Sequence, residues 1–266
     1  CRGINPHMVT VRKETKGGKT YYYLEHSYRR QRKVLKKEKY LGSTLPNELE
    51  ALKKEFLHEI YKERWYPLFE QIKKSYLNVQ KTIPPSAKAK ELEAFTIRFT
   101  YDTQRIEGSK LTLRETANLL ERGITPASKP INDVKEAEAH AELFKEVIEY
   151  EKDLKLSITL LWHRKLFAGT KSDIAGKIRE HGVIISGSKF TPPSPVEVDP
   201  LLEDFFAWYG KNREKIHPVE LAALVHLKFV TIHPFADGNG RISRLLTNFV
   251  LHKKAYPMIN IPYENR

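Results

Sequence analysis

The chain has 266 residues, 40% of them hydrophobic, and a net charge of +13 at pH 7. This length and composition suffice for one sizeable domain and a small appendage. No apolar run reaches the roughly 18 residues of a membrane-spanning helix, and the first residues lack the apolar segment of a signal peptide. The single cysteine excludes an intrachain disulfide and a cysteine-rich metal cluster. We therefore expect a cytoplasmic protein with no membrane partner, and we interpret the residues before Met8 as vector-derived.

Residues 9–42 differ from the rest of the chain in charge and periodicity. Short runs rich in Val, Tyr and Leu, with Gly17-Gly18 between two of them, predict the three strands of a small basic β-meander. Positions 11–40 hold eleven Lys or Arg against three Glu. Basic side chains interleaved with tyrosines are typical of surfaces that contact nucleic-acid phosphates and bases. The alternatives are an acidic protein partner and a solvated appendage without a ligand.

The remainder of the chain has mainly helical periodicity. Residues 47–80 predict a long amphipathic helix, which we interpret as a packing element or as the contact of a homodimer. Residues 109–121 predict a helix with a capping box formed by Thr112 and Glu115. Further helices are expected over residues 130–150, over residues 158–167, and from residue 199 or 200 to residue 209.

A helix over residues 86–107 has a carboxylate at the edge of its apolar face. Ser86 is its predicted N-cap, and Gly108 ends it. Glu107 borders the inward face, so its carboxylate loses hydration and needs a cationic partner, preferably an arginine. The alternative is a solvated glutamate at a helix end. The inward face is expected to carry Leu92, Phe95, Phe99, Thr103 and Ile106.

Residues 183–190 interrupt the helical pattern. Ile184 and Ile185, followed by Gly187 at a turn, predict a short β-hairpin. In the simplest interpretation this hairpin covers the core.

Residues 233–244 concentrate the side chains that phosphate chemistry needs. A nearly continuous apolar stretch precedes them and helical spacing follows, which predicts a loop between a buried helix and an amphipathic one. The first N–H groups of a helix that begins near Asn239 lack partners and lie at the positive end of its dipole. Because Gly238 and Gly240 have no Cβ, an anion can approach this backbone closely.

Charged side chains complete the loop. Arg241 and Arg244 are three residues apart, so we expect them on one face, away from the apolar stripe, where two guanidiniums suit a polyphosphate. Asp237 is a hard oxygen ligand suited to Mg²⁺. His233 can accept a proton from an attacking hydroxyl at neutral pH. Each of these residues alone is more often structural, but their combination predicts a phosphate-transfer site.

The loop matches the motif H-P-F-x-D/E-G-N-G-R-x-x-R at every specified position, and the chain resembles the Fic family from about Thr103 to Arg266. The resemblance implies a mostly α fold, a Fic-type helical bundle with a short β-hairpin flap, to which the N-terminal β-meander is added. Residues 176–179, 183–185 and the Pro192-Pro193 pair are similar to the flap of that family. We divide the chain into a β appendage (1–44), N-terminal helices (45–108) and a catalytic core (109–266).

Family members transfer AMP from ATP to a Ser, Thr or Tyr hydroxyl of a protein, which includes the chain itself. By resemblance, His233 is the base, Asp237 holds Mg²⁺ or Mn²⁺, and Phe235 anchors the loop in the core. The phosphates would be bound by Gly238, Asn239 and Gly240, by Arg241 near the β-phosphate and by Arg244 at the γ-phosphate.

The resemblance also implies regulation and target docking. Residues 103–108 (T-Q-R-I-E-G) are similar to the inhibitory motif S/T-x-x-x-E-G/N of class II members, with Thr103, Glu107 and Gly108 at its specified positions. In those proteins the glutamate pairs with the second motif arginine, here Arg244, and blocks productive γ-phosphate binding. The flap residues Val183, Ile184 and Ile185 would hold the target backbone by strand addition.

Three alternatives remain. The same loop can remove AMP, with Glu107 positioning water, or transfer another phosphate-containing group such as phosphocholine. The chain could instead be a nucleic-acid-binding module that acts through residues 9–42. A metal hydrolase would use His217, His226, His233 and His252, although their spacings match no standard zinc pattern.

Overall fold

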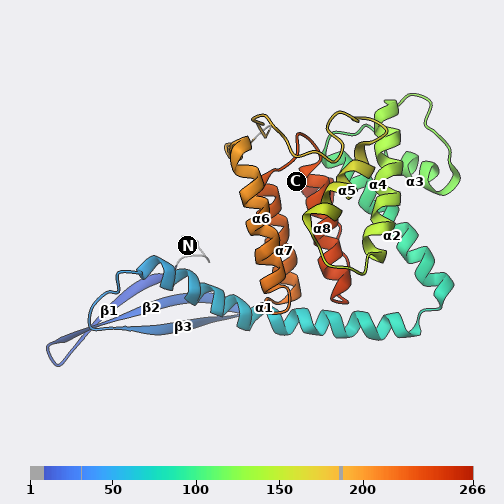
Figure 1. Cartoon of the computed structure of the whole chain (residues 1–266). Helices are drawn as coiled ribbons and strands as arrows, with labels where there is room; N and C mark the ends of the chain where they lie inside the picture. The colour runs from blue at the N-terminus through green and yellow to red at the C-terminus, as the bar shows by residue number, and fades with distance from the viewer. Residues whose placement is uncertain (1–8, 31, 186–187, 266) are drawn as a thin grey trace. The chain divides into compact units, whose positions relative to one another are not determined.

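The computed structural model describes residues 9–30, 32–185 and 188–265, and Figure 1 shows its elements. Within these residues it has three strands, eight α-helices and a final 3-10 helix, so the predicted mostly α fold with a small β-meander is confirmed. The chain divides into two compact units, Cys1–Gln71 and Ile72–Arg266. This division falls inside one helix, at neither of the predicted boundaries. The boundaries at 44/45 and 108/109 therefore remain predictions. Among the described helices, none has the length and apolar character of a membrane span.

The N-terminal unit is an antiparallel sheet covered by part of a helix. Strands β1 (Thr10–Lys16), β2 (Lys19–Arg30) and β3 (Lys33–Gly42) lie in the order β1-β2-β3. Gly17 and Gly18 have φ of +59° and +75°, which suits the tight turn between β1 and β2. The N-terminal part of α1 (Leu49–Thr82) packs on the sheet through Phe56 and Ile60, which bury Val9 and Leu24.

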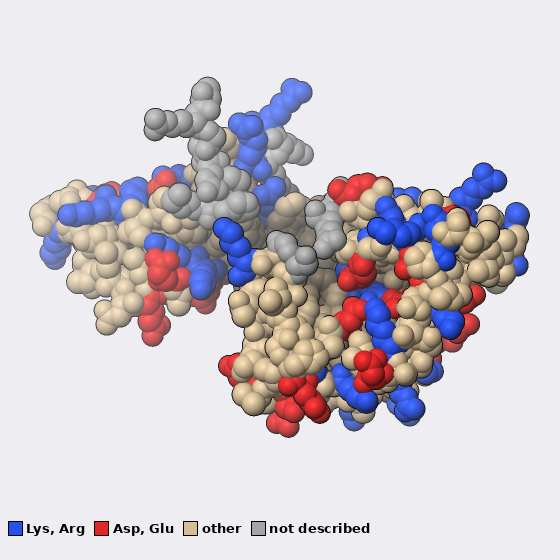
Figure 2. Space-filling model, turned by 90° about the horizontal axis from the view of Figure 1, so that it is seen from above, with Lys and Arg blue, Asp and Glu red and all other residues tan. Residues whose placement is uncertain are grey.

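Glutamates within this unit pair with part of its positive charge. On the sheet, Arg12 and Lys36 each contact Glu25 and Glu38. Figure 2 shows acidic and basic side chains close together on this part of the surface. The concentration of lysine and arginine along the sequence is therefore not an uninterrupted basic surface, which weakens the physical case for contact with nucleic-acid phosphates. Lysines of β3 also pair with α1: Lys37 with Glu63, and Lys39 with Glu55 and Glu59.

The C-terminal unit is a bundle in which α8 (Asn239–Lys253) is the most deeply buried helix. Its neighbours include α2 (Pro85–Ile106), α4 (Ile131–Glu149), α5 (Leu156–Phe167) and α7 (Pro218–Ile232). Figure 1 shows α8 in red among these helices. The unit is completed by α3 (Leu113–Arg122), α6 (Pro195–Asn212) and the 3-10 helix η1 (Tyr263–Asn265).

Helix capping explains where the predictions of helix ends succeed and fail. The predicted capping box of α3 is present: Thr112 Oγ1 accepts from the Glu115 N–H, and the Glu115 carboxylate accepts from the Thr112 N–H. Ser86 is not the N-cap of α2, because Pro84 caps it and Pro85, with its fixed φ, takes the first helical position. Helix α6 begins before residue 199, since Ser194 and Glu197 form an unrecognised capping box.

The hairpin that we predicted over residues 183–190 is not formed by the described residues of that segment. Residues 183–185 and 188–190 have no strand assignment, although the Ser188 N–H donates to the Ile185 carbonyl at 3.1 Å. Gly187 lies outside the described residues. The described part of the segment has no ladder of backbone hydrogen bonds, which a strand pair requires.

Candidate active site

The motif loop joins α7 to α8, and Asn239 fixes its shape. The Asn239 side chain accepts from the Phe235 N–H at 2.9 Å and donates to the Phe235 carbonyl at 2.8 Å. Phe235 is 1% exposed, so the predicted core anchor is present. Because both ends of its amide are used inside the loop, the side chain of Asn239 shapes the turn, and only its backbone remains suited to a phosphate.

His233 ends α7 in a left-handed conformation, with φ of +52° and ψ of +57°. This region is uncommon for residues other than glycine and marks a constrained position. Its Nδ1 lies 3.1 Å from the Val230 carbonyl oxygen, which can only accept, so Nδ1 carries the proton and Nε2 offers a lone pair. Burial lowers the pKa of His233, and the Arg179 guanidinium lowers it further. The imidazole is therefore uncharged at neutral pH and can accept a proton.

Arg179 supports the loop from the segment before α6. It is 4% exposed, and its Nε donates to the His233 carbonyl at 2.7 Å. Its backbone N–H donates to the Pro234 carbonyl at 2.9 Å, and its guanidinium also reaches the carbonyls of His181 and Pro193. Arg179 thus ties residues 176–193 to the backbone of His233, a positioning role that the resemblance did not specify.

His163 of α5 supports the loop from the other side and was missed by the sequence analysis. Its ring stacks on Phe235 with centroids 3.7 Å apart. Nδ1 accepts from the Gly176 N–H at 2.9 Å, so Nε2 carries the proton that it donates to the Asp237 carbonyl at 3.0 Å. Burial lowers the pKa of His163 to about 4. A lone histidine inside a helix gave no sequence signal for this role.

The start of α8 requires glycine at two positions. Gly238 has φ of +82°, and a Cβ there would overlap the ring of Phe167. A Cβ on Gly240 would lie 2.5 Å from Glu107 Oε1. The glycines therefore let α8 approach its neighbours closely and leave its first N–H groups accessible, as an anion site at a helix N-terminus requires.

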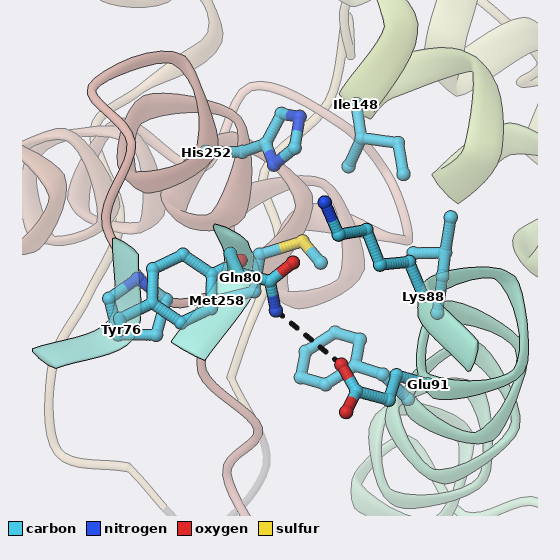
Figure 3. Close-up of a pocket in the computed structure, with 10 residues that line it drawn as sticks. Tyr76, Gln80, Lys88, Glu91, Ile148, His252 and Met258 are labelled. Carbon is cyan, nitrogen blue, oxygen red and sulfur yellow. Dashed lines mark hydrogen bonds between the residues drawn. The ribbon is translucent and has the colours of Figure 1, made fainter. Parts of the chain in front are cut away.

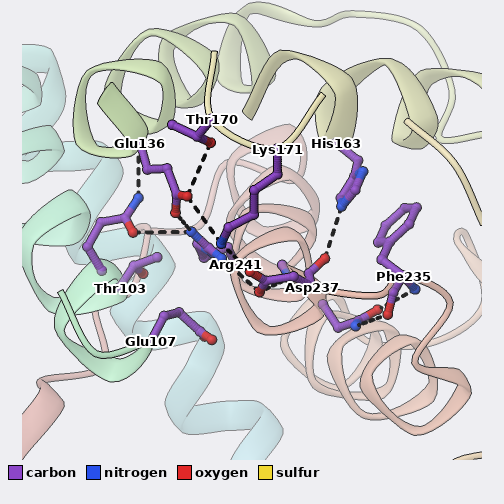
Figure 4. Close-up of polar contacts among 12 residues, drawn as sticks. Thr103, Glu107, Glu136, His163, Thr170, Lys171, Phe235, Asp237 and Arg241 are labelled. Carbon is purple, nitrogen blue, oxygen red and sulfur yellow. Dashed lines mark hydrogen bonds and ion pairs between the residues drawn. The ribbon is translucent and has the colours of Figure 1, made fainter. Parts of the chain in front are cut away.

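Arg241 is buried, contrary to our expectation of an arginine on an outward face. It is 2% exposed and pairs with Glu136 of α4, and its Nη2 lies 2.9 Å from Asp237 Oδ1. Its guanidinium also lies over the Phe167 ring, 4.6 Å from the centroid. Glu136, which the sequence analysis did not identify, allows burial because it neutralises the guanidinium. Figure 4 shows the contacts of Arg241 with Glu136 and Asp237.

Asp237 has a second cationic neighbour. Lys171 Nζ lies 2.5 Å from Asp237 Oδ2 and 3.3 Å from Glu136 Oε1. Although burial alone would raise the pKa of Asp237, Arg241 and Lys171 hold it below its usual value. Asp237 is therefore a carboxylate at neutral pH, as a metal ligand must be.

The predicted ion pair between Glu107 and an arginine is present. Arg244 Nη2 lies 2.6 Å from Glu107 Oε1, and Arg244 Nε donates to Thr103 Oγ1 at 3.1 Å. Arg244 is only 8% exposed, so it too is buried and not on an outward face. Gly108 has φ of +99°, which agrees with its predicted role as the helix stop.

A cavity of about 350 Å³ brings most of the predicted site residues together. Ile184 and Ile185 of the predicted flap line it, whereas Val183 does not. Arg241 and Arg244 do not line the cavity. Their guanidiniums contact Glu136 and Asp237, and Glu107, respectively. The cavity therefore combines a base, a carboxylate and a helix N-terminus. Its other lining residues are Ile106, Glu107, Gly108, His233, Ala236, Asp237, Gly238, Asn239 and Gly240.

The donor set fits a divalent ion that is completed by substrate. Among the described residues, no group of three or more His, Cys, Asp or Glu side chains could hold a metal. Asp237 supplies one hard oxygen donor at the cavity, and Mg²⁺ typically takes one or two carboxylates together with phosphates and water.

The histidines of the hydrolase alternative have other surroundings. His217 Nδ1 accepts from the Val219 N–H, and His226 Nδ1 lies 3.2 Å from Thr247 Oγ1. His252 lines a separate cavity of about 330 Å³, where Gln80 donates to Glu91 at 3.4 Å (Figure 3). The contacts of His217 and His226 thus lie within the protein, and His252 lines a cavity that His233 does not line.

Comparisons with known proteins agree with this architecture. Residues 153–251 match the Fic/DOC family model. A Fic domain containing signaling protein from Bacteroides thetaiotaomicron has a similar solved structure, with a TM-score of 0.68 and 32% identity; the match covers 74% of this chain and 77% of that one. The helical bundle and the loop around His233 thus define a Fic domain. The chain belongs to the Fic family.

Curated relatives are named for an activity. Protein adenylyltransferase Fic of Drosophila ananassae is 35% identical over 171 residues, which are 62% of this chain and 34% of that protein. Protein adenylyltransferase fic-1 of Caenorhabditis elegans is 34% identical over 174 residues, or 63% of this chain and 34% of that protein. The chain therefore spans about a third of the length of these relatives.

Buried neutral histidines predict that the fold loses stability in acid. Burial lowers the pKa of His140 to about 3 and that of His163 to about 4, from an ordinary 6.5. As the pH falls, the unfolded chain takes up these protons first. The contribution of the two neutral histidines to the free energy of unfolding is thus fully present above about pH 6.5. As the pH falls towards 4, each histidine lowers this free energy by about 1.4 kcal/mol per pH unit.

Urea unfolding at pH 7.5 and pH 5 measures this effect. Because other groups also titrate in this interval, the informative quantity is the difference between variants. His140→Gln should narrow the gap in unfolding free energy between the two pH values, whereas His181→Gln, at an exposed position, should leave it unchanged. An equal gap in both variants would contradict the expectation.

Proposed function

We propose that this chain is a protein adenylyltransferase, which moves AMP from ATP to a Ser, Thr or Tyr hydroxyl of a target protein. The observation that supports the proposal best is the cavity in which His233 meets the N-terminus of α8 and the Asp237 carboxylate. The names of the curated relatives support it independently.

In the proposed reaction, the triphosphate binds over the first N–H groups of α8, where Gly238 and Gly240 give it access. The target hydroxyl attacks the α-phosphorus, and His233 Nε2 accepts the hydroxyl proton. A bond forms between the hydroxyl oxygen and phosphorus, the bond to the bridging oxygen of the β-phosphate breaks, and pyrophosphate leaves. The Val230 carbonyl holds the imidazole in the required tautomer throughout.

Asp237 would hold Mg²⁺ or Mn²⁺, and the bound ion would neutralise charge on the phosphates. Arg241 would act mainly through its fixed contact with Asp237, since Glu136 already occupies part of its guanidinium. Arg244 would bind the γ-phosphate once it is released from Glu107.

The target would dock beside the cavity, at residues 183–185. Ile184 is 94% exposed, which supports a role outside the core. Backbone groups that are not used in a sheet can pair with an extended peptide and set its register without demanding a particular target sequence.

The proposed resting state is auto-inhibited. The Glu107–Arg244 pair at 2.6 Å occupies the guanidinium that the γ-phosphate needs. Removal of AMP by the same site is the alternative that this geometry also supports, because the Glu107 carboxylate faces the cavity and could orient a water molecule.

Two labelled substrates test the proposal. The Glu107→Gly chain is incubated with cell extract, Mg²⁺ and ATP labelled at either the α- or the γ-phosphate. A parallel extract receives the Glu107→Gly chain that also carries His233→Ala, and its label is subtracted. AMP transfer predicts added protein-bound label only from the α-phosphate. Added label only from the γ-phosphate would identify a kinase, and no added label from either would overturn the proposed function.

A further inference from the structure

Lys171 lies outside the motif loop, yet it is the nearest cation to one oxygen of Asp237. The residue belongs to a turn after α5, where the N–H groups of Lys171 and Ala168 are bonded to carbonyls of that helix. Its ammonium lies between two carboxylates, 2.5 Å from Asp237 Oδ2 and 3.3 Å from Glu136 Oε1 (Figure 4). With Arg241 it forms a set of two cations and two anions in which the charges balance.

The two cations of this set differ in freedom. Both contact Asp237 and Glu136 and lie over the Phe167 ring, but Arg241 is only 2% exposed. The Lys171 side chain is 36% exposed and ends in a single ammonium on a flexible stem. A further cation that arrives at Asp237 would therefore displace Lys171 and leave Arg241 in place. Glu136 remains within reach of the displaced ammonium.

We propose that Lys171 is a built-in counter-cation of Asp237, which competes with the divalent ion for this carboxylate. In the absence of metal, Lys171 neutralises Asp237 and so reduces its repulsion of the nucleotide phosphates. When the ion binds, Lys171 moves towards Glu136. Lys171 thus makes nucleotide binding less dependent on metal. This inference rests on the proposed function, since it takes Asp237 as the metal ligand and a nucleotide as its neighbour.

Calorimetric titration with a nonhydrolysable analogue, α,β-methylene-ATP, tests the inference without turnover. The analogue is titrated in Mg²⁺ and in EDTA into Glu107→Gly chains that carry Lys171 or Lys171→Met. Loss of the ammonium should weaken metal-free binding and preserve or strengthen binding with Mg²⁺. The ratio of the dissociation constant in EDTA to that in Mg²⁺ measures the coupling of metal to nucleotide. This ratio should rise at least about fivefold when Lys171 is replaced by methionine.

Three further variants sharpen the comparison. Lys171→Arg retains a cation and should keep the ratio near its original value. Lys165→Met removes an exposed lysine of α5 that pairs with Glu146 and does not line the cavity, and it should change nothing. In an Asp237→Asn background, Lys171→Met should no longer alter the ratio, because the carboxylate for which metal and lysine compete is gone.

Each remaining outcome is decisive. Equal weakening with and without Mg²⁺ would mean that Lys171 contacts the phosphates directly, which overturns the competition. An unchanged ratio in a folded Lys171→Met chain, verified by circular dichroism, would also overturn it while nucleotide binding persists. If none of the chains binds the analogue, the proposed function fails and this inference fails with it.

Discussion

Replacement of Glu107 by glycine is expected to raise AMP incorporation at least several-fold. The carboxylate holds Arg244 at 2.6 Å, and it lies so close to Gly240 that a Cβ there would meet it at 2.5 Å. Removal of this side chain frees the guanidinium for the γ-phosphate and clears space at the N-terminus of α8. Incorporation of label from the α-phosphate of ATP, measured as an initial rate, gives the comparison.

The same substitution should make the protein less stable. Arg244 is 8% exposed and would lose its ion pair with Glu107, so a charge-assisted hydrogen bond is lost at a cost of about 1.5–3 kcal/mol. A more active but less stable variant is the signature of an inhibitory contact. If Glu107 had only a structural role, its replacement would lower activity and stability together.

Two controls separate the effect of the lost charge from the effect of the lost side-chain volume and from the effect of glycine itself. Glu107→Gln keeps the volume and removes the charge, so its activity should fall between those of the parent and the glycine variant. Glu121→Gly introduces glycine near the end of α3, at an exposed position, and should not activate the chain. Unchanged or lower incorporation in Glu107→Gly would refute the inhibitory role.

The loop around His233 was predictable because its chemistry is contiguous in the sequence. Twelve neighbouring residues contain the base, the carboxylate, the glycines and both arginines, and the apolar spacing on either side indicates the helices. The contact of Glu107 was predictable for another reason. A carboxylate at the edge of a packed face needs a cation, and the resemblance supplied Arg244 as its partner.

The residues that surround the loop were not predictable in this way. Glu136, His163 and Lys171 come from α4, α5 and the turn after it, and each has an ordinary sequence context. Their roles arise only when packing brings them to Asp237, Arg241 and Phe235. A residue-by-residue reading of charge and spacing does not contain this information.

The misplaced arginines illustrate the same limit. Helical spacing put Arg241 and Arg244 away from the apolar stripe of α8, which is the usual position of a solvated pair. The structure buries both, since Glu136 meets Arg241 and Glu107 meets Arg244. Periodicity locates an apolar face correctly. It does not show whether a carboxylate of another helix lies opposite a polar face and allows that face to be buried.

Replacement of His233 by alanine in the Glu107→Gly background is expected to lower AMP incorporation by about 10²–10⁴-fold. Among the described residues that line the cavity, His233 has the only imidazole. Its loss removes the proton acceptor without removing the helix N-terminus that binds phosphate. Binding of α,β-methylene-ATP, measured by calorimetry, should therefore remain close to that of the parent, so the defect lies in the chemical step.

The dependence of the rate on pH identifies the group that is lost. Burial and Arg179 lower the pKa of His233 from its ordinary 6.5, and only the neutral form can accept a proton. The parent rate should thus stay level at neutral pH and decline only as the pH falls through a value below 6.5. The residual rate of His233→Ala should lack this decline, whereas His181→Ala, at an exposed position, should retain it. A rate in His233→Ala within twofold of the parent would assign proton transfer to another group, and the constrained backbone of His233 would then need a structural explanation.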